Sequence, residues 1–103
     1  MDDLLALADA EKADKLKLHF GKPPVMVWYD KYPKLPGGKA SLIEGPAITS
    51  EDSEHFLFSL ANSRQRREIR ERGGATFFFL FRGSILFLVR ASVTDGVVGF
   101  EIQ

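Results

Sequence analysis

The sequence predicts an α+β domain in which helices cover one face of a mostly antiparallel sheet. Residues 15–20 alternate strictly between polar and apolar side chains, which is the period of a half-buried strand. Residues 49–72 carry cap residues followed by apolar side chains at helical spacing. Residues 75–102 contain Gly83-Ser84 and Asp95-Gly96, two hairpin signals that divide the segment into three strands. We expect the order α-β-β-α-α-β-β-β within one domain of residues 1–103.

The first half begins with a helix that we expect to run from Asp2 or Asp3 to about Asp14, because apolar side chains recur at positions 4, 5, 7 and 8. The alternating segment 15–20 follows, and Gly21 with Pro23-Pro24 ends it. Residues 25–29 are rich in strand formers and predict a second strand. Residues 33–46 hold three prolines and three glycines, so we expect a long loop with room for a short strand near Leu42-Ile43.

The second half contains two helix starts. Thr49 with Asp52 three residues later is the pattern of a capping box, and apolar side chains follow it at positions 56, 57, 60 and 61. Asn62-Ser63 either ends this helix or caps the next one, which spans residues 64–72 and ends at Gly73-Gly74.

Composition excludes several classes of function. The 103 residues include no cysteine, so neither a disulfide framework, a thiolate metal site nor a cysteine nucleophile is available. The two histidines are far apart, which disfavours a histidine-built metal site. Fourteen basic and fourteen acidic side chains leave no net charge to attract nucleic acid or a membrane surface. The acidic start and the interruption of the apolar stretch 77–91 favour a soluble, cytoplasmic protein without a membrane span.

We predict no catalytic, cofactor-binding or metal-binding residue. The segment 37–41 brings a lysine near glycines, but it lacks the spacing of a phosphate-binding loop. His19 and His55 are expected to be solvated. Residues 64–72 carry five arginines and two glutamates, a pattern compatible with nucleic-acid binding. No aromatic side chain interrupts this run, and three i, i+4 pairs favour a self-paired surface helix: Arg64–Glu68, Arg67–Glu71 and Glu68–Arg72.

The three C-terminal strands predict an apolar outer face. A two-residue turn at Gly83-Ser84 sets Phe81 opposite Leu86, and the turn at Asp95-Gly96 sets Arg90 opposite Glu101. Because opposed residues share a face, one side of the sheet would carry Phe77, Phe79, Phe81, Leu86 and Leu88 beside the pair Arg90 and Glu101. Such a patch indicates an association face. The alternatives are a small-molecule pocket, or a second core under the loop 33–46.

Nearly the whole chain resembles the N-terminal domain of the hexameric ATPases of the secretion superfamily, and most of all that of the type IV pilus retraction motors. The match is carried by Leu4-Leu5, by Ala13-Asp14-Lys15-Leu16-Lys17-Leu18, and by Gly21-Lys22-Pro23-Pro24. Residues 49–72 are similar to the middle helices of the family, residues 86–90 to its Arg-Phe-Arg-Val-Asn strand, and residues 97–102 to its closing strand. The resemblance implies a PAS-like fold and contact with other subunits.

The departures from this family concern its chemistry. The two arginines that serve the nucleotide site in the family are Leu86 and Leu88 here, its strand arginine is Val27, and its histidine is Lys17. The sequence ends where the family's linker begins. We therefore expect a non-enzymatic protein–protein interaction domain of pilus or secretion machinery, with a protein partner or a dimer. The alternatives are an N-terminal fragment of a full ATPase, or a nucleic-acid-binding module that uses residues 64–72.

Overall fold

The computed structural model describes residues 2–28, 39–43 and 45–103. Along this part of the chain the elements are α1 (Asp2–Ala10), β1 (Lys15–Leu18), β2 (Val25–Trp28), β3 (Lys39–Leu42), α2 (Ser50–Leu60), α3 (Ser63–Arg72), β4 (Gly74–Phe81), β5 (Ile85–Thr94) and β6 (Val97–Ile102). The predicted order holds, with the addition that the short strand foreseen in the loop is formed as β3.

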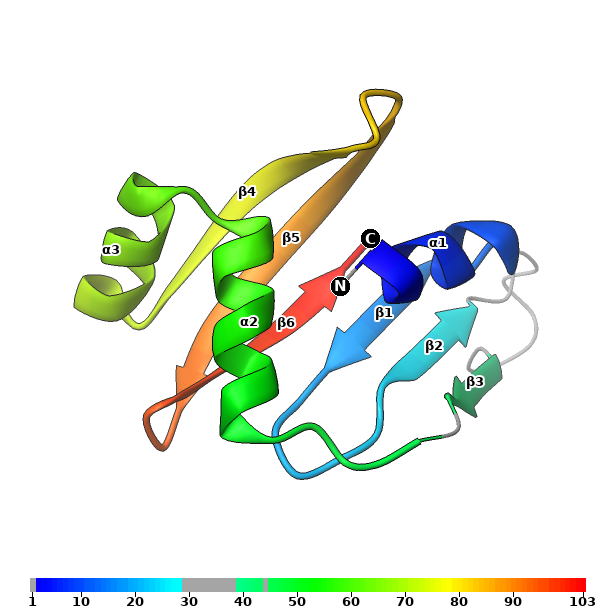
Figure 1. The fold of residues 1–103 in the computed structure, drawn as a ribbon, viewed down its shortest axis with the longest axis horizontal. Coiled ribbons are helices and arrows are strands. Elements are labelled where there is room, and N and C mark those ends of the chain that lie inside the picture. Colours follow the sequence, from blue (N-terminus) through cyan, green and yellow to red (C-terminus); the bar gives the residue numbers. More distant parts are fainter. Residues whose placement is uncertain (1, 29–38, 44) are drawn as a thin grey trace, which may run out of the picture.

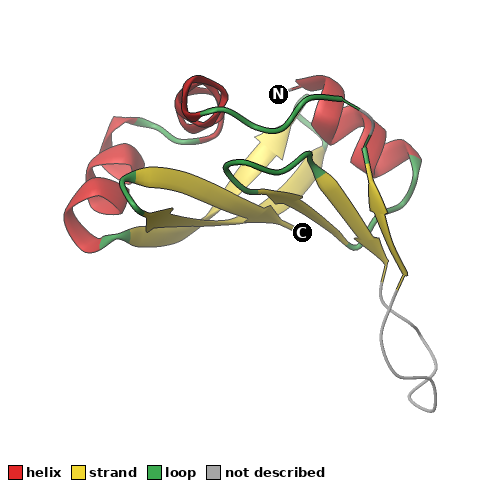
Figure 2. Cartoon of the chain, turned by 90° about the horizontal axis from the view of Figure 1, so that it is seen from below, coloured by secondary structure: helices red, strands yellow, loops and turns green. Residues whose placement is uncertain are grey.

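The six strands make one antiparallel sheet in the order β3-β2-β1-β6-β5-β4. Helices α1 and α2 lie on one face of this sheet, and α3 packs at its end beside β4 and β5 (Figures 1 and 2). No described helix covers the opposite face, which we call the outer face. The predicted α+β class is confirmed, and the described helices leave one face of the antiparallel sheet uncovered.

Helix α1 ends four residues before the predicted boundary. The amide of Ala13 donates to the carbonyl of Ala8 (3.0 Å) and the amide of Lys12 to that of Asp9 (3.1 Å). This bond pattern closes a helix through a residue in the left-handed region, and Lys12 has φ 53°. A lysine is uncommon at such a position, which glycine usually occupies, so the sequence carried no stop signal there.

The start of α2 is as predicted. Of the two alternatives for Asn62-Ser63, the structure shows the cap of α3, and both helices begin with a capping box. Thr49 accepts from the amide of Asp52, whose carboxylate accepts from the amide of Thr49. Asn62 and Gln65 make the same reciprocal pair at the start of α3. Gly73 then ends α3 with φ 80°, as the glycine pair predicted.

The core lies between the helices and the inner face of the sheet. From the helices it takes Leu5, Leu57 and Ile69, which are fully buried. Phe56 of α2 meets Phe100 of β6 edge to face, with 6.4 Å between the ring centroids. The sheet contributes an alternating set of buried side chains: Leu16, Leu18, Met26, Phe77, Phe81, Val89, Ala91, Val98, Phe100 and Ile102.

The register of the β4–β5 hairpin differs from the prediction by one residue. Phe81 pairs with Ile85, so the turn holds three residues, 82–84. Arg82 and Gly83 both have positive φ, 51° and 70°, and the amide of Ser84 donates to the carbonyl of Phe81 at 3.2 Å. The β5–β6 register, with Arg90 opposite Glu101, is as predicted. One extra turn residue therefore reverses the faces of β4 and leaves those of β5 unchanged.

Two neighbouring phenylalanines test this register. Phe77 is 8% exposed and belongs to the core, whereas Phe78 is 65% exposed. We expect Phe77→Ala to lower the free energy of unfolding by about 3–5 kcal/mol, because it leaves a cavity in the core. Phe78→Ala is the matched control and should lower it by less than about 1 kcal/mol. Urea titrations of both variants measure this, and a larger effect at Phe78 would support the predicted register instead.

Candidate interaction surface

The outer face of β4 and β5 carries exposed apolar side chains. Phe78, Leu80 and Leu86 are 65%, 56% and 60% exposed, and Leu88 is partly exposed. Leu80 lies directly opposite Leu86, and Phe78 lies opposite Leu88. Opposed residues on one face are close neighbours, so these four side chains form a continuous surface, which we call the apolar patch.

The apolar patch differs from the predicted one in its β4 members. Phe77 and Phe81 are buried, and Phe79 is partly buried against the core, so these three phenylalanines leave the predicted face. Phe78 and Leu80 take their place, while Leu86 and Leu88 stay where the sequence placed them.

A signal in the sequence could have identified the correct β4 face. Thr76 and Arg82 are in phase with Phe78 and Leu80, so the predicted register aims a threonine and an arginine at the core. The alternate positions of β4, Phe77, Phe79 and Phe81, are all aromatic and include no polar residue. The two-residue hairpin signal at Gly83-Ser84 predicts the opposite face, and the register of the structure shows that this prediction is wrong.

A polar strip borders the apolar patch on the outer face. Glu101 of β6 lies opposite Arg90 on one side and opposite Lys17 on the other. Its ion pair is formed with Lys15, whose Nζ is 3.2 Å from the Glu101 carboxylate, with side-chain exposures of 13% and 33%. Among the described residues no ion pair joins Glu101 to Arg90. Arg90 is therefore left exposed at the border of the apolar patch.

The Glu101 carboxyl has a lowered pKa. Partial burial acts in the opposite direction and raises this pKa, since it penalises the charged form. The hydrogen bond from Lys15 and its positive charge, with further help from Lys17 and His19, outweigh burial. The pKa of Glu101 consequently lies below its ordinary value of 4.5, and the strip remains charged at neutral pH.

Beyond the polar strip, the outer face forms an open hollow of about 640 Å³. Lys17, His19 and Lys22 bring basic groups to its wall, and Phe20 supplies an exposed ring. The other wall residues come from β2, β5, β6 and the adjoining turns: Pro23, Val25, Ser92, Thr94, Asp95, Val97 and Gly99. His19 is thus an exposed wall residue of this hollow, and His55 lies exposed on α2.

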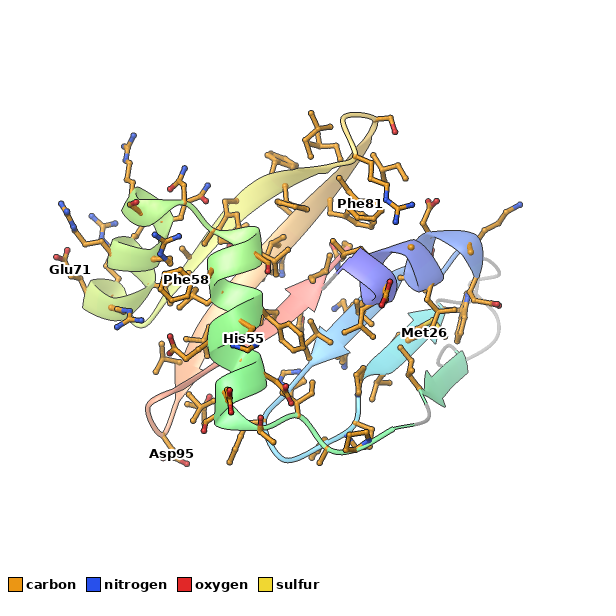
Figure 3. All side chains as sticks on the ribbon, viewed as in Figure 1. Met26, His55, Phe58, Glu71, Phe81 and Asp95 are labelled. Atoms are coloured by element: carbon orange, nitrogen blue, oxygen red, sulfur yellow. The ribbon has the colours of Figure 1, made fainter. Side chains whose placement is uncertain are left out.

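The arginines of α3 are used differently from the prediction. Of the three expected i, i+4 pairs, only Glu68–Arg72 is formed within the described residues, at 3.9 Å. Arg66 instead donates to the carbonyl of Ala61 (2.6 Å) and lies over the ring of Phe58, with 4.4 Å to the ring centroid. Figure 3 shows Phe58 between α2 and α3.

A second arginine strengthens this link between the two helices. Arg70 pairs with Glu54 of α2 at 3.2 Å. Arg66 and Arg70 therefore link α3 to α2. The expected self-paired helix is found only in part, in the pair Glu68–Arg72.

Three further expectations concern metal sites, membrane spans and the loop 33–46. In the described residues no cluster of three or more His, Cys, Asp or Glu side chains has the arrangement of a metal site. None of the described helices has both the length and the apolar character needed to cross a membrane. Residues 33–38 and 44 of the loop 33–46 lie outside the described residues. The strand formed within this loop, β3, is at the opposite edge of the sheet from the apolar patch.

Comparison with known proteins identifies the fold. Over its whole length the structure superposes on part of a crystal structure of the pilus retraction motor PilT with bound ADP, with a TM-score of 0.79 and 21% sequence identity. The fold is that of a pilus-motor N-terminal domain. The chain spans 28% of the length of that PilT chain. No family model and no curated protein sequence matches it.

The fold expected from the resemblance is thus confirmed, and the structure shows where the positions lie that differ from the resembling motors. Leu86 and Leu88, which stand where the resembling motors are expected to carry arginines, lie on the outer face within the apolar patch. In this chain that part of the PilT-like fold is apolar.

The pKa of Glu101 predicts how stability depends on pH. Because the folded-state pKa is lowered, the stabilisation is present above about pH 4.5 and is lost as the pH falls through the lower folded-state pKa. We expect the difference in unfolding free energy between wild type and Glu101→Gln, up to about 1 kcal/mol, to shrink between about pH 6 and about pH 3. Urea titrations across this range measure it.

Glu71→Gln is the control for this measurement, because it removes the same charge from the exposed surface of α3. A difference between wild type and Glu101→Gln that stays constant over the range would show that the ion pair with Lys15 does not stabilise the fold.

Proposed function

We propose that this chain is a non-enzymatic interaction domain of pilus or secretion machinery, and that the apolar patch is its contact with another protein subunit. The single observation that carries the proposal is the exposure of Phe78, Leu80 and Leu86 side by side on a face that no described helix covers. Burial of apolar surface contributes about 25 cal/mol per Å², so burying these side chains would offset a good part of the free energy that association costs.

The polar strip supports the same proposal. Arg90 and the Glu101–Lys15 pair lie at the border of the apolar patch, where charged groups orient a partner and contribute little affinity. An apolar centre with a polar rim is the usual composition of a protein interface.

The biological setting is proposed from the fold. PilT is a motor crystallised with ADP, and a chain with the fold of one of its domains fits an assembly of that kind. We propose that residues 1–103 act as one domain and that the protein works in the cytoplasm, where nucleotide-driven motors meet their nucleotide. Either a partner subunit or a second copy of this chain would cover the apolar patch.

A second candidate function is that of the N-terminal domain within a complete pilus or secretion ATPase. Its support is the whole-length superposition on a part of PilT that amounts to 28% of that chain. Leu86 and Leu88 favour the first candidate, because leucine side chains cannot stabilise phosphate charge as arginines do. Nucleic-acid binding through residues 64–72 is less well supported, since Arg66 already donates to the carbonyl of Ala61, directly after α2, and Arg70 already pairs with Glu54 of α2.

Photo-crosslinking in cells of the source organism tests the proposed contact. Benzoylphenylalanine in place of Leu86 should give a covalent adduct with a component of the pilus or secretion machinery, identified by mass spectrometry. The same amino acid in place of Leu7, an exposed leucine on α1, should give none. Adding Leu88→Arg should reduce the adduct at position 86 by more than about tenfold, because it places an unpaired charge in the contact.

Two results would contradict the proposed contact. One is an equal yield of adducts at positions 86 and 7, and the other is the absence of any adduct at position 86. A smaller yield after Leu88→Arg counts only if circular dichroism shows that the variant remains folded.

ATP titration distinguishes the two candidate functions. We expect isothermal calorimetry on the purified domain to show no saturable ATP binding at micromolar concentrations, since positions 86 and 88 lack the arginines that the resemblance associates with the nucleotide site. Leu86→Arg combined with Leu88→Arg provides a matched comparison. Saturable micromolar binding by the wild type would favour the second candidate.

A further inference from the structure

Strand β4 is an edge of the sheet. It is the last strand in the order β3-β2-β1-β6-β5-β4, so only one of its sides is paired, with β5. Helix α3 lies beside the beginning of β4, whereas the second half of the strand runs away from it toward the hairpin (Figure 1). The exposed part of this edge is therefore the second half of β4, residues 78–81.

Hydrogen bonds between β5 and the C-terminal residue show which way the backbone groups of the hairpin point. Leu88 exchanges two backbone hydrogen bonds with Gln103, at 2.9 and 2.8 Å, so both of its polar backbone groups face the β6 side. Backbone groups alternate in direction along an antiparallel strand. Phe87 and Val89 must therefore direct theirs toward β4.

The same alternation applies to β4. Its residues Phe79 and Phe77 pair with Phe87 and Val89 and direct their backbone groups inward. Phe78 and Leu80 consequently direct their N–H and C=O groups outward, away from the sheet. In the described part of the chain no hydrogen bond from another element reaches these groups.

Strand β4 also lacks the features that usually protect an edge. The sequence of residues 74–81, GATFFFLF, contains no proline and no charged residue, and every residue in it pairs in register with β5 without a bulge. The chain as a whole has no net charge, so two copies do not repel one another. An uncharged, regular edge of this kind is a template for another strand.

We infer that two copies of this chain associate by pairing their β4 edges, antiparallel, with Phe78 opposite the second copy's Leu80. In this register each outward backbone group of Phe78 and Leu80 meets a complementary group of the other copy. Opposed side chains share a face, so Phe78 meets a leucine on the outer face and Phe79 meets its own counterpart on the inner face. A strand with an apolar side chain at each of these positions complements itself.

Edge pairing deepens the proposed function and rests on it, because it joins the apolar patches of two copies into one surface. The side chains of Phe78 and Leu80 belong to the apolar patch, and the backbone N–H and C=O groups of the same two residues point outward from the sheet edge. Leu86 and Leu88 lie on β5, one strand farther from the junction, and remain available to a partner. The dimer would present a doubled apolar surface.

Sedimentation equilibrium of four proteins tests the edge pairing: wild type, Phe78→Val, Phe78→Pro, and Leu86→Arg with Leu88→Arg. Valine and proline both remove the phenylalanine ring, but only proline removes the outward N–H, and it does so without breaking a hydrogen bond to β5. We expect the wild type to dimerise and Phe78→Pro to dimerise at least about tenfold more weakly than Phe78→Val. The double arginine variant should keep most of its dimer, because its substitutions lie away from the junction.

Amide exchange on the wild type provides a measurement that needs no substitution. By NMR, the amides of Phe78 and Leu80 should exchange rapidly at low protein concentration and become protected as the dimer forms. The inward amides of Phe77 and Phe79 should be protected at every concentration, which makes them an internal control.

The outcomes separate the edge pairing from the proposed function. If the double arginine variant abolishes the dimer while the proline and valine variants behave alike, the copies meet through the apolar patch and the edge pairing is wrong. A wild type that stays monomeric at all concentrations, with exposed amides at Phe78 and Leu80, also overturns it. Crosslinking from position 86 would in that case still decide the proposed function.

Discussion

The register of the β4–β5 hairpin is the constraint on which the exposed surface of this protein depends. Two residues with positive φ, Arg82 and Gly83, make the turn one residue longer than a tight two-residue hairpin. Since side chains alternate with period two, this one residue assigns Phe77 to the core and Phe78 to solvent. A shorter turn would have produced a different core and a different surface from the same strand.

A sheet with helices on one face needs an explanation for its other face. Here the outer face passes from the apolar patch on β4 and β5, through the ion pair of Lys15 with Glu101, to a hollow with basic side chains in its wall. Strand topology sets the order of these three surface regions, because β6 lies between β5 and β1 and brings Glu101 within reach of Lys15. Strands far apart in sequence thus build one graded surface.

The likeness to PilT concerns the backbone fold, whereas the differences from the resembling motors concern exposed side chains. The backbone follows a PilT-like fold over the whole chain at 21% identity, because a core tolerates many substitutions as long as its volume and its apolar pattern are kept. The exposed positions are free of that requirement, and at Leu86 and Leu88 they are apolar where the resemblance implies arginine. Guanidinium groups suit phosphate, whereas exposed leucines suit another apolar surface, so the proposed function follows the surface and not the fold.

The sequence by itself determined the elements whose signals are local. Thr49 with Asp52 specified the start of α2 through a capping box, and the glycine at position 73 specified the end of α3, because these signals act within one helical turn. Tertiary structure decided the end of α1 at Ala10 and the face of β4, since a lysine at position 12 and an arginine at position 82 take the positive φ that glycine usually adopts. It also decided that Arg66 binds the chain before α3 and stacks on Phe58, because competition among several partners is resolved only when the elements pack together.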